Sequence, residues 1–401
     1  MDNLTHTIVG LAVGDAIHRS LAPEADPTAQ RTRRRLALTA CALASNFPDL
    51  DLLLTKRLPA PLGYLLEHRG HTHTFLLEIP QALLLCALLW LLWPAARRLL
   101  GESGRARAVL AASLVIGFVL HISMDFLNSY GVHPLYPFDQ RWLFGDMIFI
   151  IEPMFWVGAG VPLIMTLHRR GARLAWLGVL AAALLACVPL GFLHWSSLVL
   201  LGLVSAAAMF ASGAGGRRGF AAGLALCAAF IGFQAAGTHS ARRLLEDAAA
   251  PSRLLDAALT AYPANPLCWN FVTIEARPGA DAYRMRRGVL SLAPGLMPVS
   301  ACPAGLTGPV SAPGGSAIAV LDDKSGSLAA LRARAGADCY FNAWLRFARA
   351  PLLAGSVGSD LRFGTTLAPN FSTIELDHFK GRACPSAVPP WGMPRADLLR
   401  Q

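Results

Sequence analysis

The chain has 401 residues, of which 54% are hydrophobic and only 15% are charged, and its mean hydropathy is +0.45. A soluble globular protein carries about 25% charged residues, so this composition excludes an ordinary soluble domain and indicates a membrane protein with a soluble part attached. The formal net charge of +10 would favour nucleic acid as the partner of a soluble chain. Most of these basic residues lie in short loops between apolar segments, so we expect membrane lipids and no nucleic acid as partners.

The first two apolar segments are shorter or more interrupted than typical membrane spans. Residues 1–18 predict an apolar helix that Asp2 or Asn3 would cap, but this helix is shorter than the ~20 residues that a bilayer requires. No basic residue precedes the apolar segment, so we do not interpret it as a cleaved signal peptide. A second apolar segment over 36–54 ends in a proline and two aspartates, which interrupt it.

Longer apolar segments then predict an all-α polytopic membrane domain over residues 1–238. Each segment is close to the roughly 20 residues that a membrane-spanning helix needs. The expected spans lie at about 75–94, 108–126, 147–167, 174–192, 196–212 and 219–237.

The orientation of these spans follows from the basic residues in alternate loops. Lysine and arginine number five in 19–35, four in 97–107, three in 169–173 and two in 213–218. On the opposite side they number three in 55–74, one in 127–146 and none in 193–195. The positive-inside rule makes the first set of loops cytoplasmic. We therefore expect a multi-pass protein of the bacterial inner membrane, whose C-terminal part lies outside the cytoplasm.

The stretch from His121 to Gly131 contains the most informative motif. On a helix, His121, Asp125 and Asn128 fall within an arc of roughly 60° and share one face. An imidazole and a carboxylate one turn apart can bind a single divalent cation. In isolation, such a pair is more often a hydrogen-bonded pair at a helix end, so the interpretation depends on the rest of the chain.

Other histidines and aspartates are expected at the same membrane face. The alternation of spans places His6, Asp49, Asp51, His68, His71 and His73 at the extracytoplasmic ends of their segments, beside His121 and Asp125. Imidazole and carboxylate suit zinc and related metals, and ionisable groups at a membrane edge are costly enough to indicate function. We therefore predict a divalent metal site, with zinc expected. A solvated loop with unrelated helix caps is the alternative.

Four ordered motifs carry a family resemblance. They are Asp2-Asn-Leu-Thr5-His6, Pro48-Asp49-Leu-Asp51, His68-Arg69-Gly70-His-Thr72-His73 and His121-x3-Asp125-x2-Asn128-Ser-Tyr130-Gly131. Over roughly residues 1–160 the chain resembles the membrane-bound metal-dependent hydrolases of the YdjM type, the DUF457 family. In that pattern His71 occupies a variable position.

The order of the ligands is also similar to that of zinc-dependent phospholipases C and nucleases of the P1 type. Those enzymes carry a further histidine and a second H-x3-[DE] motif, which this chain lacks after Asp125. His133 and Asp146 are possible substitutes. The resemblance therefore implies one or two metal ions more readily than three.

The resemblance and the ligand chemistry assign expected roles. The expected metal ligands are His6, Asp49, His73, His121 and Asp125, with Asp51 and His68 as further ligands or as groups that orient them. Asn128 would orient ligands or substrate, Asp146 or Glu152 would act as general base, and Arg69 or Arg141 would hold an anionic group. Asp146, Glu152, Arg69 and Arg141 are each more often structural than catalytic residues.

After residue 238 the composition indicates a small β-rich (α+β) domain over 239–401. We expect an amphipathic helix over 240–260, a helical segment near 337–349, and short strands at 271–276, 317–321, 361–363 and 372–376. Four cysteines lie in this domain: Cys268, Cys302, Cys339 and Cys384. They permit two disulfides with three possible pairings, and the absence of C-x2-C spacing argues against a zinc ribbon.

These observations predict metal-dependent hydrolysis at the extracytoplasmic membrane face, on a phosphoester or ester of a lipid-linked or envelope substrate. The alternative is a non-enzymatic membrane scaffold or sensor, with a structural metal site and an outer domain that recognises a partner. We see no paired broken helices of the kind that transporters carry. The substrate, the number and identity of the metal ions and the oligomeric state stay open.

Overall fold

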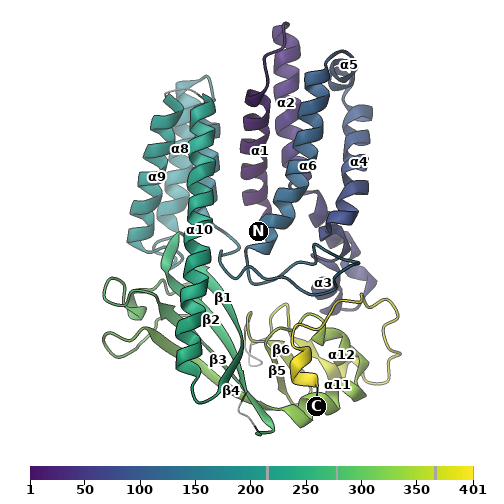
Figure 1. Ribbon diagram of the computed structural model, residues 1–401, viewed down its shortest axis with the longest axis vertical. Helices are drawn as coiled ribbons and strands as arrows, with labels where there is room; N and C mark the ends of the chain where they lie inside the picture. Colours follow the sequence, from purple (N-terminus) through teal and green to yellow (C-terminus); the bar gives the residue numbers. More distant parts are fainter. Residues whose placement is uncertain (214–215, 277–278, 365–367, 401) are drawn as a thin grey trace.

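The structure is a computed structural model that describes residues 1–213, 216–276, 279–364 and 368–400. A bundle of long helices forms one part of the molecule, and a β-rich region with two sheets forms the other (Figure 1). The predicted fold class is therefore confirmed. Within the described residues, five helical segments are long and apolar enough to cross a membrane: Pro27–Arg57, Phe75–Leu92, Gly104–Phe126, Trp195–Gly213 and Gly216–Ala249.

The first half of the bundle is held together by close helix contacts. It contains α1 (Asn3–Ser20), α2 (Pro27–Ala44), α4 (Phe75–Leu92), α5 (Pro94–Glu102) and α6 (Gly104–Phe126). A Cβ atom at Gly14 would lie 2.6 Å from the backbone oxygen of Ala37, and one at Gly117 would lie 2.6 Å from the Cβ of Ala44. Small residues thus let α1 and α6 approach α2 closely, which brings the ends of these helices together.

The second half of the bundle contains α7 (Pro153–Met165), α8 (Arg170–Ala186), α9 (Trp195–Gly213) and α10 (Gly216–Ala249). The span expected at 147–167 is shorter in the structure, because the side chain of Glu152 caps the helix by accepting a hydrogen bond from the N–H of Met154 at 3.1 Å. Pro153 at the first helical position fixes the same start. The span expected at 174–192 likewise ends at Ala186.

Helix α10 joins the bundle to the β-rich region without a break. Its 34 residues run across the predicted boundary at 238, where the sequence changes composition but contains no proline. The amphipathic helix expected over 240–260 is therefore the second half of α10, and it ends before Pro251. Ala241 and Leu245 of this half pack with Leu259 and Trp269 of the sheet.

The larger sheet is antiparallel in the order β1 (Arg253–Tyr262), β2 (Asn265–Ala276), β3 (Ala282–Ser291) and β4 (Ile318–Ser327). The strands expected at 271–276 and 317–321 lie in β2 and β4. Strand β3 was not predicted, because three arginines interrupt its apolar pattern. All three arginines pair across the sheet, Arg284 with Asp323, Arg286 with Glu275 and Arg287 with Asp322, so their charges are compensated.

A smaller sheet and short helices complete this region. They are β5 (Pro351–Ala354), β6 (Val357–Asp360) and β7 (Ile374–Glu375), with α11 (Leu328–Ala337), α12 (Cys339–Leu345) and α13 (Ala396–Leu399). The strand expected at 361–363 is a turn in the structure, the one at 372–376 overlaps β7, and the helix near 337–349 is α12. Disulfides join Cys268 to Cys302 and Cys339 to Cys384, which fits a domain outside the cytoplasm.

The two regions share one hydrophobic core at their junction. Helix α3 (Leu62–Glu67), between α2 and α4, packs its leucines against Trp344 and Trp391 of the β-rich region. The indole N–H of Trp391 donates to the backbone oxygen of Leu66 at 2.7 Å, and that of Trp142 donates to the oxygen of Arg346 at 2.6 Å. The C-terminal region is therefore docked on the end of the bundle rather than tethered to it.

A buried arginine reinforces this junction. Arg349 is 3% exposed and lies between two carboxylates, with Asp146 at 2.7 and 2.8 Å and Asp256 at 2.7 and 2.9 Å. Burial raises the pKa of Asp256, but the charge of Arg349 outweighs it and holds that pKa well below its usual value. The stabilisation from Asp256 is therefore complete above about pH 4 and is lost as the pH falls below that value.

We expect Arg349→Met to lower the free energy of unfolding by about 3–5 kcal/mol, because it removes the cation closest to both carboxylates. The more distant Arg242 and Arg395, at 3.3–3.5 Å, then remain as their only cations among the described residues. Urea denaturation of the detergent-purified protein at pH 7 measures this loss. Arg141→Met is the matched control, since Arg141 forms an exposed pair with Asp139 and its removal should leave the unfolding curve unchanged. Equal stability of the two variants would contradict the assignment.

Candidate metal centre

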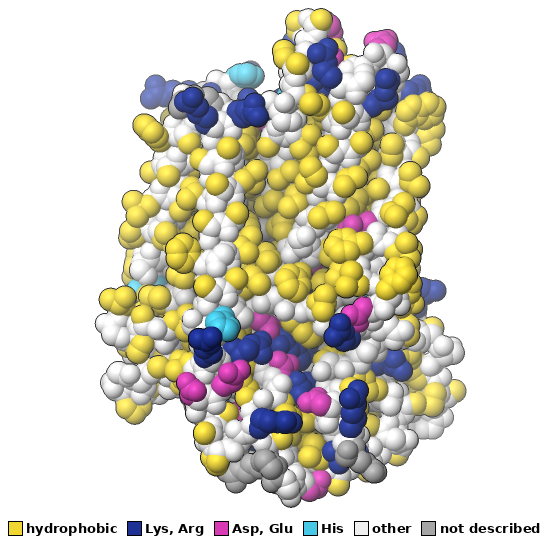
Figure 2. Space-filling model, in the orientation of Figure 1, with side chains coloured by type: hydrophobic (Ala, Val, Ile, Leu, Met, Phe, Trp, Pro, Cys, Tyr) yellow, Lys and Arg dark blue, Asp and Glu magenta, His cyan; other side chains and the backbone are white. Residues whose placement is uncertain are grey.

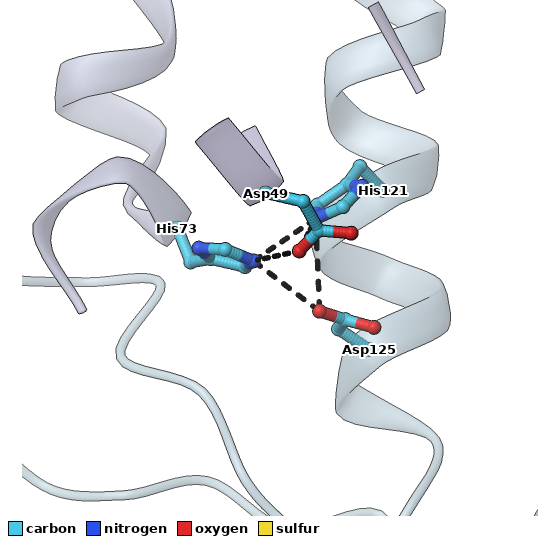
Figure 3. Close-up of side chains that lie close together, drawn as sticks. All are labelled: Asp49, His73, His121 and Asp125. Atoms are coloured by element: carbon cyan, nitrogen blue, oxygen red, sulfur yellow. Dashed lines mark hydrogen bonds and ion pairs between the residues drawn. The ribbon is translucent and has the colours of Figure 1, made fainter. Parts of the chain in front are cut away.

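Four buried side chains converge at the end of the bundle that faces the β-rich region (Figure 3). Asp49 comes from η1 (Phe47–Arg57), which follows α2, and His73 comes from η2 (His71–His73), which precedes α4. His121 and Asp125 lie one turn apart at the end of α6. Each of the four side chains has a ligand atom within 4.8 Å of those of the others.

The distances among these atoms are short. The Nε2 atoms of His73 and His121 lie 2.9 Å apart. His73 Nε2 lies 3.4 Å from Asp49 Oδ1 and 3.3 Å from Asp125 Oδ2, and His121 Nε2 lies 3.6 Å from both oxygens. Four ligands at zinc bond lengths of 2.0–2.1 Å would be separated by about 3.3 Å in a tetrahedron, so the residues fit one such ion.

Nδ1 of His73 and Nδ1 of His121 each face a hydrogen-bond acceptor. Each Nδ1 therefore carries the hydrogen, and each Nε2 carries the lone pair. His121 Nδ1 lies 2.7 Å from the backbone oxygen of Ser45, so Nδ1 carries the hydrogen and donates it. His73 Nδ1 lies 3.1 Å from Asp51 Oδ2 and donates in the same way. Both Nε2 atoms therefore present lone pairs to the centre of the cluster, as metal-bound histidines do.

The centre of the cluster is consequently surrounded by acceptors. Two imidazole lone pairs meet two carboxylate oxygens, and Asp125 Oδ2 is buried without a hydrogen-bond donor among the described residues. A buried acceptor that has no hydrogen-bond donor is costly. A cation at the centre would satisfy all four atoms at once.

A proton on His73 is the alternative to a metal. Burial lowers the pKa of His73, but the carboxylates of Asp125, Asp49 and Asp51 outweigh it and raise that pKa well above its usual value. A single proton on His73 Nε2 can be donated fully to only one of the acceptors around it, which are His121 Nε2 at 2.9 Å, Asp125 Oδ2 at 3.3 Å and Asp49 Oδ1 at 3.4 Å. The donor set as a whole is therefore better satisfied by a metal ion.

Asp51 and His68 form a neighbouring group. Asp51 Oδ1 lies 3.0 Å from His68 Nδ1, while its Oδ2 accepts hydrogen bonds from the N–H of Arg69 and the hydroxyl of Thr72, both at 2.9 Å. Asp49, Asp51 and His68 together form a second group of ligand atoms within 4.8 Å. Asp51 thus orients His73 and His68 and lies within reach of a second ion.

His6, Arg69 and Asn128 surround Asp125 from the other side. Asp125 Oδ1 lies 3.3 Å from His6 Nε2 and 3.0 Å from an Nη atom of Arg69, and the α-amino group of Met1 also contacts it. The other Nη atom of Arg69 donates to Asn128 Oδ1 at 3.0 Å. His6 stacks on His121 with ring centroids 4.2 Å apart. His6 and Arg69 therefore contact Asp125 or His121 but are not among the four whose ligand atoms lie within 4.8 Å of one another, so the role of His6 as a ligand stays a prediction.

Two predicted carboxylates have other partners in the structure. Asp146 is paired with Arg349, as described above, and Glu152 accepts hydrogen bonds from the backbone N–H groups of Met154 and Ala264. Neither forms a hydrogen bond or ion pair with the four central residues in the described part of the chain. The structure therefore gives both carboxylates partners at the junction of the two regions.

The remaining predicted residues also lie outside the cluster. His133 stacks on Trp391 with ring centroids 4.1 Å apart, and His71 packs against the same tryptophan at 4.7 Å. Burial lowers the pKa of His133 to about 3, so this ring is neutral. Arg141 is exposed and paired with Asp139.

Sequence reasoning missed the contribution of Ser45 and Thr72. Ser45 acts through its backbone carbonyl, which carries no sequence signal. Thr72 donates to Asp51 and lies 3.0 Å from His73 Nδ1, and its place between His71 and His73 could have indicated a role in orienting the ligand.

Comparison with known proteins shows a family similarity for the part of the chain that carries this cluster. A family model described as YdjM inner membrane protein matches residues 1–191. Residues 1–191, slightly less than half of the chain, are thus similar to this family. All residues of the cluster lie inside the matched region.

One relative extends the comparison. The chain is 26% identical over 157 residues to the uncharacterised protein YfhP of Bacillus subtilis (strain 168), an alignment that covers 39% of this chain and 43% of YfhP. The chain thus spans less than half the length of this curated relative. No solved structure matches the chain.

The cluster predicts that metal binding requires His73 but not the neighbouring His71. We expect His73→Ala to abolish the binding of a near-stoichiometric divalent metal ion, because it removes one Nε2 from the centre, and His71→Ala to retain it. Metal content of the purified variants, measured by mass spectrometry after reconstitution with zinc or manganese, makes the comparison. Equal metal content in the two variants would show that the cluster does not hold the ion.

Proposed function

We propose that the protein is a membrane-bound, metal-dependent hydrolase of the bacterial inner membrane, with its active site at the extracytoplasmic face. The convergence of two imidazole lone pairs and two carboxylate oxygens carries this proposal. A bound divalent ion, for which zinc is the best fit to two imidazoles and two carboxylates, would lower the pKa of a water ligand and polarise the bond to be cleaved.

The pair of His68 and Asp51 supports the chemistry beside this ion. Asp51 holds Nδ1 of His68, so the Nε2 of that ring is the atom available to take up or release a proton. The His68 side chain is 12% exposed, whereas those of His73 and His121 are fully buried. We therefore assign to His68 the acid–base role that the sequence suggested for Asp146 or Glu152.

The location of the cluster supports a lipid-linked or envelope substrate. Exposed leucines of η1 lie next to Asp49 and Asp51, with Leu50 at 52% and Leu53 at 77% exposure. Such side chains are expected at the membrane edge. The substrate bond is a phosphoester or an ester. Arg69, which we expected to hold an anion, is already bound to Asp125 and Asn128.

Burial of the ligands favours a second candidate function. Asp49 is the most exposed of the four at 9%, and a site closed by four protein ligands is typical of structural zinc. In that case the protein is a membrane scaffold or sensor in which the metal holds the bundle ends together and the outer region recognises a partner.

Replacement of His68 separates the two functions. We expect His68→Gln to lower the hydrolysis of bis(p-nitrophenyl) phosphate or of a p-nitrophenyl ester by about 10²–10⁴-fold, while the bound metal is retained because the four central ligands remain. Activity and metal content are measured on the same preparation. His239→Gln is the control, since His239 is exposed on α10.

A wild-type protein that binds one zinc ion but hydrolyses neither ester class would contradict the hydrolase proposal and support the structural role. Loss of metal in His68→Gln would instead identify His68 as a ligand and contradict its assignment to proton transfer.

A further inference from the structure

A pocket lies where α1, α2, α7 and α10 meet, at the opposite end of the bundle from the metal cluster. Its volume is about 520 Å³, within the range of about 300–1,000 Å³ typical of small-molecule sites. Four arginines line it: Arg19 of α1, Arg31 and Arg34 of α2, and Arg217 of α10. Figure 2 shows dark blue side chains gathered at this end, above the apolar flanks of the helices.

The positive charge of this pocket is only partly compensated. Asp15 is fully buried beneath the pocket, where it contacts the Nε atoms of Arg19 and Arg34, the latter at 2.6 Å. Within the described residues, Arg31 and Arg217 form no ion pair, and both are exposed. Four guanidinium groups therefore face one carboxylate, an arrangement suited to a phosphate group.

An apolar groove of about 230 Å³ lies along the same seam, between α1, α6, α7 and α10. Val13, Phe155 and Ile231 are among its lining residues. Val13 precedes Arg19 by six residues on α1, which corresponds to about 9 Å along the helix. The seam, where the two halves of the bundle meet, thus has arginine side chains at one end and an apolar groove deeper in the membrane part.

We propose that this seam binds an anionic phospholipid, with the phosphate against the arginines and an acyl chain in the apolar groove. The basic pocket lies at the predicted cytoplasmic interface, where anionic head groups gather and basic pockets between helices bind them. A soluble phosphate compound could bind the arginines but would leave the apolar groove empty. The combination therefore selects a lipid.

Native mass spectrometry of the full-length protein in detergent tests the head-group site. The protein is titrated with phosphatidylglycerol and with phosphatidylcholine of the same acyl chains. We expect tighter binding of phosphatidylglycerol and a loss of affinity of tenfold or more in Arg31→Gln/Arg217→Gln, at about fivefold for each basic residue. Arg97→Gln/Arg98→Gln is the control, because it removes the same charge from exposed positions at the same end. Equal loss in both double variants, or no preference for phosphatidylglycerol, overturns the proposal.

Two further measurements test the acyl-chain groove. Ala228→Phe fills the groove and should weaken the binding of phosphatidylglycerol, whereas Ala225→Phe, at an exposed position elsewhere on α10, should not. Glycerol 3-phosphate should compete poorly with the lipid, because it lacks the chain. Full displacement of the lipid by glycerol 3-phosphate, or unchanged binding in Ala228→Phe, would show a site for soluble anions and overturn the proposal.

Discussion

The structure depends on the burial of several ionisable groups at the edge of a membrane. Asp49, His73, His121 and Asp125 are removed from water, although such groups are stable there only with partners. Ser45 and Asp51 take the outer hydrogens of the two imidazoles, and Arg69 neutralises one oxygen of Asp125. What these partners leave unsatisfied is the centre, and a metal ion that the four side chains could hold there would link the ends of α2, α4 and α6.

The outer, β-rich region is packed directly against the helix bundle. It shares α10 with the bundle, covers α3 with Trp344 and Trp391, and supplies Arg349 to Asp146. The loop that follows Asn128 is consequently held between the end of α6 and the β-rich region. Because this loop also carries Tyr130, whose ring lies under the guanidinium of Arg69 at 4.8 Å, the docking of the outer region is coupled to the environment of Asp125.

The sequence predicted the parts that depend on local pattern. Alternating basic loops placed the histidines and aspartates at one end of the bundle, and the spacing of His121 and Asp125 predicted their shared face; the structure brings these residues together. The surroundings of Asp146 could not be predicted, because its partner Arg349 is 203 residues away and no pattern links them. Strand β3 was missed for a similar reason, since its arginines are compensated only by neighbours across the sheet.

The side chains in and around the cluster differ in their exposure to solvent. The four central residues are almost closed to solvent, and the neighbouring His68 is the more open side. There Tyr64 of α3 contacts Phe371 of the outer region, with ring centroids 5.6 Å apart, and both side chains are partly exposed. In the proposed hydrolase, a substrate would approach the cluster from this side. A purely structural metal would need no such approach, so the greater exposure at His68 is the feature that distinguishes the two proposed functions.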